Sequence, residues 1–287
     1  MDLVSDIQPF HGKPCTIFSL DIKDLYYSLQ PAILLSRVRL FLEENLVRFQ
    51  SQSGMEINEF LRILELYLRS TVVNHNEQKY IQRQGVCIGS AVAPALSEIY
   101  LRSLDLKVHE MVKNCNPDSV LIRRYVDDIL VCVLDSAMAG SIENTVYREA
   151  PELQFSIERP GNNVLQYLDL QLRLVPGLCW SYGKVKPKPI LPFDSCHSKH
   201  IKAGLVRNMI NNAVQRSCCH SIWTSIQGLL SRLSDAKYPQ EFLTKQLSYI
   251  VASGKKDQKK SEHKTFVVIP FFHRVSHNLK SIGEKFG

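Results

Sequence analysis

Three aspartates occur at positions where their carboxylates could bind metal ions. Asp21 ends an apolar run that begins at Cys15, and Asp127 and Asp128 separate two further apolar runs. The β-branched and aromatic residues of these runs favour strands, so we expect a hairpin with Asp127 and Asp128 at its tight turn. Aspartate is also common in turns that have no chemical role, because its side chain hydrogen-bonds to nearby backbone. A solvated turn is therefore the alternative to a metal site.

The chemistry of these carboxylates depends on whether they meet. If the strand that ends at Asp21 lies beside the hairpin, all three carboxylates converge at one edge of a sheet. Such a cluster repels itself unless cations neutralise it. Mg²⁺ prefers oxygen ligands, and two ions about 3.5–4 Å apart stabilise the attacking and leaving oxygens of a phosphoryl displacement. The pattern predicts nucleotidyl transfer with two Mg²⁺ ions, for which Mn²⁺ is a substitute.

The elements around these residues alternate between helical and extended patterns, which indicates an α+β fold. Apolar spacing predicts helices over residues 22–29, 32–50, 57–73, 94–113, 141–149, 200–215, 217–233, 239–251 and 275–286. Strands are expected over residues 15–21, 79–84, 120–126, 129–134, 153–158, 164–174, 178–182 and 266–270. Residues 1–14 show no clear period.

Charge divides the chain into two parts. Residues 1–183 hold 17 Lys+Arg against 22 Asp+Glu, and residues 184–287 hold 18 against 6, so a net −5 is followed by a net +12. The basic, proline-broken segment 184–189 is typical of a linker or extended arm. We therefore expect a carboxylate-bearing domain over 1–183 and a basic, mostly helical one over 184–287. Such a basic region suggests a polyanion partner, although solubility alone also explains it.

The sequence predicts an intracellular protein, nuclear or cytoplasmic, that is not secreted and has no membrane partner. No apolar run reaches the roughly 18 residues of a membrane span, and Asp2 and Asp6 stand where a signal peptide is apolar. The eight cysteines are scattered, which favours reduced thiols. Cys196–His197, His200 and Cys218–His220 have spacings of no usual zinc motif, so we interpret them as buried thiols and surface histidines.

Three motifs together resemble those of reverse transcriptases. Phe18–Tyr26 is similar to their first catalytic motif, Gln84–Pro94 to the motif that positions template and nucleotide, and Tyr125–Asp128 to their catalytic Asp-Asp hairpin. A Tyr-X-Asp-Asp sequence alone is a weak signal, whereas three motifs in this order are a specific one. The resemblance implies a palm, with helices on one face of an antiparallel sheet, and a helical thumb after it.

The similarity extends to the reverse transcriptases of Penelope-like retroelements. Leu153–Leu174 resembles their strand and primer-gripping hairpin, and Ser195–Lys202 with the following helix resembles their thumb. Val267–Ser276 resembles the segment that closes the thumb. Because only fourteen residues precede Cys15, we expect the fingers to be largely missing.

The resemblance also implies a metal site. Asp21 and Asp127 would hold both ions, with assistance from Asp128, and the backbone carbonyl of Ile22 would add a ligand. The same four residues are thus the expected metal ligands, and the three aspartates are the expected catalytic residues.

Further residues are implied to contact the nucleotide and the nucleic acid. Tyr26 stands where the family places the aromatic ring that screens the sugar 2′ position, and a buried core tyrosine is the alternative. Gln84 and Gly85 would pack against nucleotide and template, unless they only form a loop that leads into a helix. Lysines that suit phosphate contacts are Lys184, Lys186, Lys188, Lys199 and Lys202.

The sequence therefore predicts an RNA-directed DNA polymerase fragment of a retrotransposon. Its partners would be an RNA template with a DNA primer and a dNTP, and no protein partner is indicated. The alternative is a catalytically inactive nucleic-acid-binding remnant that lacks fingers. A polymerase that uses a DNA template is a third hypothesis, because the carboxylates alone do not distinguish it.

Overall fold

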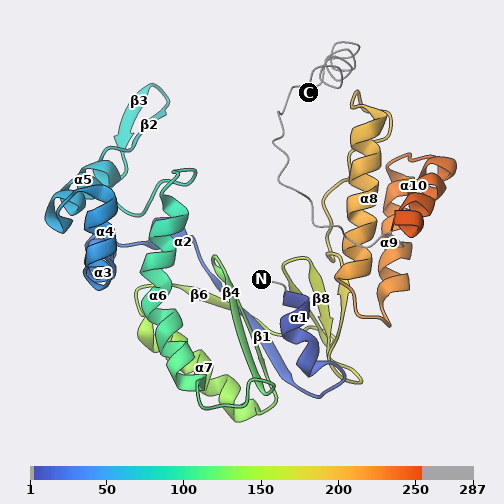
Figure 1. Cartoon of the computed structure of the whole chain (residues 1–287), viewed down its shortest axis with the longest axis horizontal. Helices are drawn as coiled ribbons and strands as arrows, with labels where there is room; N and C mark the ends of the chain where they lie inside the picture. The colour runs from blue at the N-terminus through green and yellow to red at the C-terminus, as the bar shows by residue number, and fades with distance from the viewer. Residues whose placement is uncertain (1–2, 254–287) are drawn as a thin grey trace. The chain divides into compact units, whose positions relative to one another are not determined.

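The computed structural model describes residues 3–253, with side chains to residue 250 (Figure 1). The chain divides into two compact units, Met1–Pro239 and Gln240–Gly287, each described by itself. The helix and strand expected over 266–270 and 275–286 lie outside the described residues. The domain boundary expected at residue 184 stays a prediction.

A four-stranded antiparallel sheet forms the centre of the first unit, in the order β4-β5-β1-β6. Its strands are β4 (Val120–Tyr125), β5 (Asp128–Val133), β1 (Thr16–Ile22) and β6 (Phe155–Glu158). The inner strands β1 and β5 are the most apolar, and both faces of the sheet are covered. These two strands therefore carry apolar residues on both faces rather than on alternate positions.

Helices cover one face of this sheet, as predicted. Phe18, Leu20 and Ile22 of β1 belong to a core shared with α3 (Pro31–Glu44), α5 (Ile57–Arg69), α6 (Ala93–Val112) and α7 (Ser136–Glu149). Figure 1 shows α6 and α7 along this side of the sheet. The α+β fold with an antiparallel sheet is thus confirmed.

The opposite face packs on a second, three-stranded sheet. Its strands are β7 (Val164–Tyr167), β8 (Leu170–Arg173) and β9 (Cys179–Tyr182). Leu130 and Cys132 of β5 share a core with this sheet and with the first elements of the chain, α1 (Leu3–Ile7) and η1 (Gln8–Phe10). The single strand expected over 164–174 is therefore a hairpin, which turns where Leu168 takes a positive φ of 50°.

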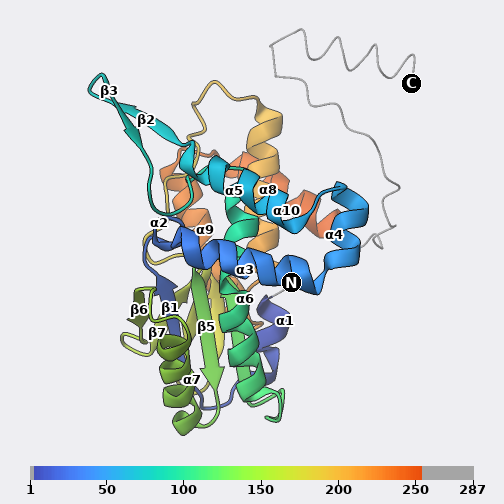
Figure 2. The same cartoon turned by 90° about the vertical axis from the view of Figure 1, so that its left-hand side faces the viewer.

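Short helices and a hairpin connect β1 to α6. They are α2 (Leu25–Ser28), α3, α4 (Leu46–Ser53), α5, β2 (Val72–His75) and β3 (Gln78–Ile81) (Figure 2). The helix expected over 32–50 breaks at Asn45, whose side-chain amide donates to the carbonyl of Phe41 (2.8 Å). The β2–β3 hairpin turns at Asn76 and Glu77, which both have positive φ, as a tight hairpin requires.

Two helices, α8 (Lys199–Gln215) and α9 (Ile222–Asp235), complete the first unit, and α10 (Gln240–Ser253) belongs to the second. The Ser198 side chain caps α8 by accepting from the backbone N–H of Ile201 (3.3 Å). In the part of the chain that the structure describes, no helix combines the length and apolar character needed to cross a membrane.

Candidate active site

The three aspartates meet at one end of the central sheet. Asp21 on β1 lies directly opposite Asp128 on β5. The backbone N–H of Ile22 donates to the carbonyl of Asp127 (3.1 Å), so the hairpin tip is bonded to the end of β1. Residues directly opposite in an antiparallel pair have Cβ atoms about 4.5–5.5 Å apart. The sheet pairing on which the predicted chemistry depends is therefore present.

The hairpin turn lies one residue earlier than predicted. Tyr125 pairs with Asp128, so Val126 and Asp127 form the tip and Asp128 is the first residue of β5. Val126 has a φ of 58°, which is rare for a β-branched residue. The preference of aspartate for turns suggested an Asp127–Asp128 tip, but the register of β5 against β1 places Asp128 in the sheet.

Arg124 stabilises the hairpin tip at Val126 and Asp127. Its guanidinium donates to the carbonyl of Val126 (3.0 Å) and to both carboxylate oxygens of Asp105 (2.9 and 2.6 Å) and of Glu98 (2.9 and 2.8 Å) on α6. The arginine side chain is only 10% exposed. These bonds raise the pKa of Arg124 above its usual range, and Arg124 lowers the pKa of Glu98. The backbone conformation beside Asp127 is therefore supported by helix α6.

The carboxylate cluster carries an excess of negative charge. Burial raises the pKa of Asp128 above its usual value, and the charges of Asp127, Asp21 and Glu158 raise it further, while Lys184 opposes them. The hydroxyl of Ser156 donates weakly to Asp21 (3.4 Å). Several carboxylate oxygens with little positive charge near them fit the hard-oxygen coordination that Mg²⁺ prefers. The donor set thus fits a divalent cation.

Tyr167, on the second sheet, contacts the backbone of the β4–β5 hairpin. Its hydroxyl lies within hydrogen-bond distance of the carbonyls of Asp128 (3.2 Å) and Arg123 (3.3 Å). Burial, and then the charge of Asp128, raise the pKa of Tyr167 above its usual range, so the hydroxyl keeps its proton as a donor. The sequence analysis assigned no role to Arg124 or Tyr167, and only the apolar alternation of β7 hints that Tyr167 points inward.

The two segments expected to contact the nucleotide, around Tyr26 and around Gly85, lie side by side. The N–H of Val86 donates to the carbonyl of Tyr26 (2.7 Å), and a Cβ on Gly85 would lie 2.5 Å from that carbonyl oxygen. Gly85 has a φ of 72°, so both its conformation and its surroundings exclude a side chain. Tyr26 is half-buried and Gln84 is exposed. The need for glycine here arises from a close approach to the chain's own backbone.

The expected phosphate-binding lysines differ in exposure. The side chains of Lys184, Lys186, Lys188 and Lys199 are exposed. Lys202 is 5% exposed, and its ammonium donates to the carbonyl of Ser195 (2.7 Å) and lies over the ring of Phe193. A phosphate contact would require that ammonium to leave its present partners, so Lys202 is not a free phosphate-binding group in this structure.

Residues 5–159, more than half of the chain, match the family described as reverse transcriptase (RNA-dependent DNA polymerase). The chain belongs to the reverse transcriptase family. It is therefore of the RNA-directed DNA polymerase class, whose members generally use divalent metal ions. The three strands around the aspartate cluster, β1, β4 and β5, lie within the matched residues.

Solved telomerase structures have a similar fold. Telomerase from Candida albicans, in complex with a fragment of telomeric RNA, is 12% identical over 87% of this chain and 43% of its own, with a TM-score of 0.60. Apo telomerase from Candida tropicalis is 11% identical over 87% of this chain and 44% of its own, with a TM-score of 0.51. The chain thus spans less than half the length of these telomerases. No protein of curated function matches the sequence.

Proposed function

We propose that this reverse transcriptase chain catalyses RNA-templated DNA synthesis, in which a primer 3′-OH attacks the α-phosphate of a dNTP. The observation that carries the proposal is the cross-strand pairing of Asp21 with Asp128, with Asp127 at the adjoining hairpin tip. Three carboxylates held this close together lower the stability of the fold when no cation is bound, because their charges repel one another. A structural role alone therefore explains the cluster poorly.

In this proposal Asp21 and Asp127 hold two Mg²⁺ ions, with Asp128 and the backbone carbonyl of Ile22 as further ligands. When bound, the ions supply charge that stabilises the attacking and leaving oxygens of the displacement. The chain's own contribution is to place the carboxylates: Arg124 supports the tip that carries Asp127. Mn²⁺, which also accepts carboxylate ligands, substitutes for Mg²⁺ in this proposal.

Tyr26 selects the sugar in the proposed reaction. Its backbone carbonyl accepts a hydrogen bond from Val86, and its half-buried side chain packs against the core on the helix-covered side of the sheet. A ring at this place collides with a ribose 2′-OH and so favours deoxynucleotides. Gln84 and Gly85 are proposed to pack against the incoming nucleotide and the template.

The basic segment after β9 is proposed to contact the phosphates of the primer–template. The lysines concerned are Lys184, Lys186, Lys188 and Lys199, all exposed. Lys184 acts electrostatically on Asp128, so this segment begins close to the carboxylates. Binding by such contacts weakens as salt rises, because phosphate neutralisation releases counterions.

We further propose that the chain derives from a retrotransposon of the Penelope-like kind. The support is the sequence similarity of residues 153–174, a strand followed by a hairpin, and of the region around 195–202 to that group. The likeness to telomerases extends to the fold alone. An RNA template is proposed from the family, and the RNA-bound telomerase is a precedent within the same fold.

The direct test is primer extension on an RNA template with Mg²⁺ and dNTPs. We expect the wild type to incorporate nucleotides and Asp127→Asn to lose about a hundredfold or more of the rate, as when a charge-stabilising group is removed. Asp24→Asn is the matched control, because Asp24 is exposed, lies outside the cluster and has a positive φ that asparagine tolerates.

Two outcomes contradict the proposal. Equal incorporation by the wild type and Asp127→Asn would remove the carboxylates from the mechanism. Salt-sensitive binding of primer–template by a folded protein, with no incorporation under Mg²⁺ or Mn²⁺, would instead support the non-catalytic nucleic-acid-binding alternative.

A further inference from the structure

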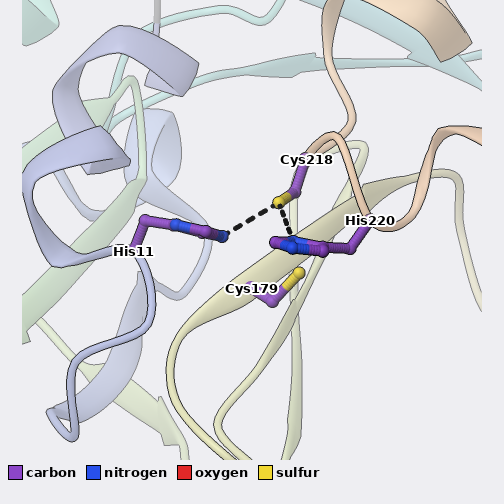
Figure 3. Close-up of side chains that lie close together, drawn as sticks. All are labelled: His11, Cys179, Cys218 and His220. Carbon is purple, nitrogen blue, oxygen red and sulfur yellow. Dashed lines mark hydrogen bonds between the residues drawn. The ribbon is translucent and has the colours of Figure 1, made fainter.

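Four metal-ligating side chains from distant parts of the chain meet away from the carboxylate cluster. They are His11, Cys179, Cys218 and His220, here called the His/Cys cluster (Figure 3). Their ligand atoms all lie within 4.8 Å of one another. His11 follows η1, Cys179 begins β9, and the other two lie between α8 and α9. We propose that the His/Cys cluster is a structural Zn²⁺ site with four protein ligands.

The spacing of the ligand atoms suits one tetrahedral ion. With usual zinc bond lengths, neighbouring ligand atoms lie about 3.3 Å apart for two nitrogens and about 3.8 Å apart for two sulfurs. Cys218 Sγ lies 3.1 Å from His11 Nε2 and 3.3 Å from His220 Nδ1. Figure 3 shows both imidazoles and both thiols directed toward a common point. Small side-chain movements are therefore enough to bring all four atoms to zinc distances.

A purely hydrogen-bonded cluster satisfies these groups poorly. The Cys218 thiol has one proton to donate and is a weak acceptor, yet two imidazole nitrogens lie next to it. Zn²⁺ would displace the protons of both thiols and accept the lone pairs of both imidazoles, and two thiolates balance its charge. Sulfur and imidazole ligands also select zinc over magnesium.

The backbone holds the ligands together independently of any ion. The N–H of Gly12 donates to the carbonyl of Leu178 (2.9 Å), and the N–H of Leu178 donates to the carbonyl of Lys13 (3.1 Å). These bonds place His11 beside the start of β9. The packing is so close that a Cβ on Gly177 would lie 2.3 Å from the carbonyl oxygen of Gly12.

The third ligand-bearing segment is attached to the same strand. The N–H of Cys218 donates to the carbonyl of Trp180 (3.0 Å), and the hydroxyl of Ser217 accepts from the N–H of Tyr182 (3.0 Å). The His11 ring also packs edge-on against Trp180 and parallel to the ring of His220. A preformed set of four protein ligands with no open position is typical of a structural zinc site rather than a catalytic one.

The sequence analysis did not find this site, because spacing within one segment gave no signal. Cys218 and His220 were interpreted as a buried thiol and a surface histidine, and their burial agrees with that. Their partners His11 and Cys179 come from segments that only the fold brings near. For Cys196 and Cys219 the interpretation as buried thiols is wrong, because both are exposed, and neither belongs to the cluster.

The test measures metal content of the full chain. Protein saturated with ZnCl₂ under reducing conditions and then dialysed should retain about one zinc per chain, as a four-ligand structural site does. Co²⁺ in its place should give the visible absorption of a tetrahedral thiolate complex. Cys179→Ser and His220→Gln should each lower zinc affinity about tenfold or more.

Matched controls separate the site from other thiols and from the carboxylates. Cys196→Ser removes an exposed cysteine outside the cluster, and Asp127→Asn removes a proposed magnesium ligand, so both should keep one zinc. His220 is exposed, which makes His220→Gln the variant least able to disturb folding, and circular dichroism verifies that it is folded.

Three results overturn the proposal. They are negligible zinc in folded wild-type protein, full zinc retention by both cluster variants, and a Cys179–Cys218 disulfide found by mass mapping of protein purified without reductant. Because none of these readouts involves polymerisation, the zinc proposal and the polymerase proposal fail or stand separately.

Discussion

The contribution of Arg124 to the β4–β5 hairpin can be measured by replacing it with glutamine. Arg124→Gln removes two ion pairs and the bond to the Val126 carbonyl. Glu98 and Asp105 are 57% and 42% exposed, so solvent screening reduces each pair to about 1 kcal/mol. The bond to the carbonyl adds about 1 kcal/mol. We therefore expect a loss of about 3 kcal/mol, which lowers Tm by about 6–12 °C in a domain of this size.

The neighbouring Arg123 provides a matched control on the same strand. It is 41% exposed and pairs only with Asp6 among acidic side chains of the described residues, so Arg123→Gln should cost less than about 1 kcal/mol. Thermal unfolding followed by circular dichroism compares the two variants. Arg124→Lys should fall between Arg124→Gln and the wild type, because lysine keeps the charge but lacks the forked geometry.

The reasoning also predicts an effect on catalysis beyond stability. At a temperature where every variant is folded, Arg124→Gln should slow primer extension more than Arg123→Gln. The reason is that the tip that carries Asp127 is no longer linked to α6 through Arg124. If the two glutamine variants unfold at the same temperature and extend primers equally, Arg124 does not support the hairpin and the reasoning is refuted.

Two further predictions concern a glycine and a carboxylate. Gly85→Ala should reduce Tm or soluble yield far more than Gly89→Ala. Both glycines have positive φ, but only a Cβ on Gly85 would clash with backbone, at 2.5 Å from the Tyr26 carbonyl oxygen. Equal losses would show that the backbone conformation alone causes the effect. Asp128→Asn should raise Tm in EDTA at pH 7. Because the folded-state pKa of Asp128 is raised, its ionisation costs stability as pH rises through that pKa, chiefly through burial and then through repulsion from Asp127 and Asp21. Asp128 is partly exposed, so the gain is below about 1 kcal/mol and should shrink toward pH 4; a variant less stable than wild type at pH 7 would contradict this.

Local patterns were sufficient for most elements of the fold. The apolar runs that end at Asp21, precede Asp127 and follow Asp128 predicted strands, and β1, β4 and β5 are strands. Helical spacing likewise predicted α6 and the helices around 57–69 and 199–215. These elements are long or strongly apolar, and local propensity agrees with their tertiary packing.

The predictions that failed are those where a tertiary contact overrides local preference. Val126 and Leu168 take positive φ although neither residue type favours it. The first turn was therefore predicted one residue too late, and the turn at Leu168 was missed within the strand expected over 164–174. At Val126 the reason is the register of β5 against β1, and bonds from Arg124 compensate the strain. The side-chain amide of Asn45 donates a hydrogen bond to the carbonyl of Phe41 where α3 ends. Helical periodicity does not predict this bond.

The candidate site was predictable only in part, for the same reason. Motif order identified the carboxylates, but the supports of the hairpin come from elsewhere in the chain: Glu98 and Asp105 from α6 and Tyr167 from β7. Each is an ordinary polar residue in its own segment. Their roles arise from packing between elements, for which a single sequence gives no period or spacing to read.

The second sheet connects the two proposed metal sites. Tyr167 bonds to the carbonyl of Asp128 at one end, and it pairs with Leu170 of β8. Leu170 in turn pairs with Tyr182 of β9, the strand that begins with Cys179. Zinc at the His/Cys cluster would therefore strengthen the sheet that supports the carboxylate strand. Chelation should lower the Tm of the wild type without changing its Mg²⁺ requirement, whereas a changed Mg²⁺ requirement would mean that zinc acts on the carboxylates themselves.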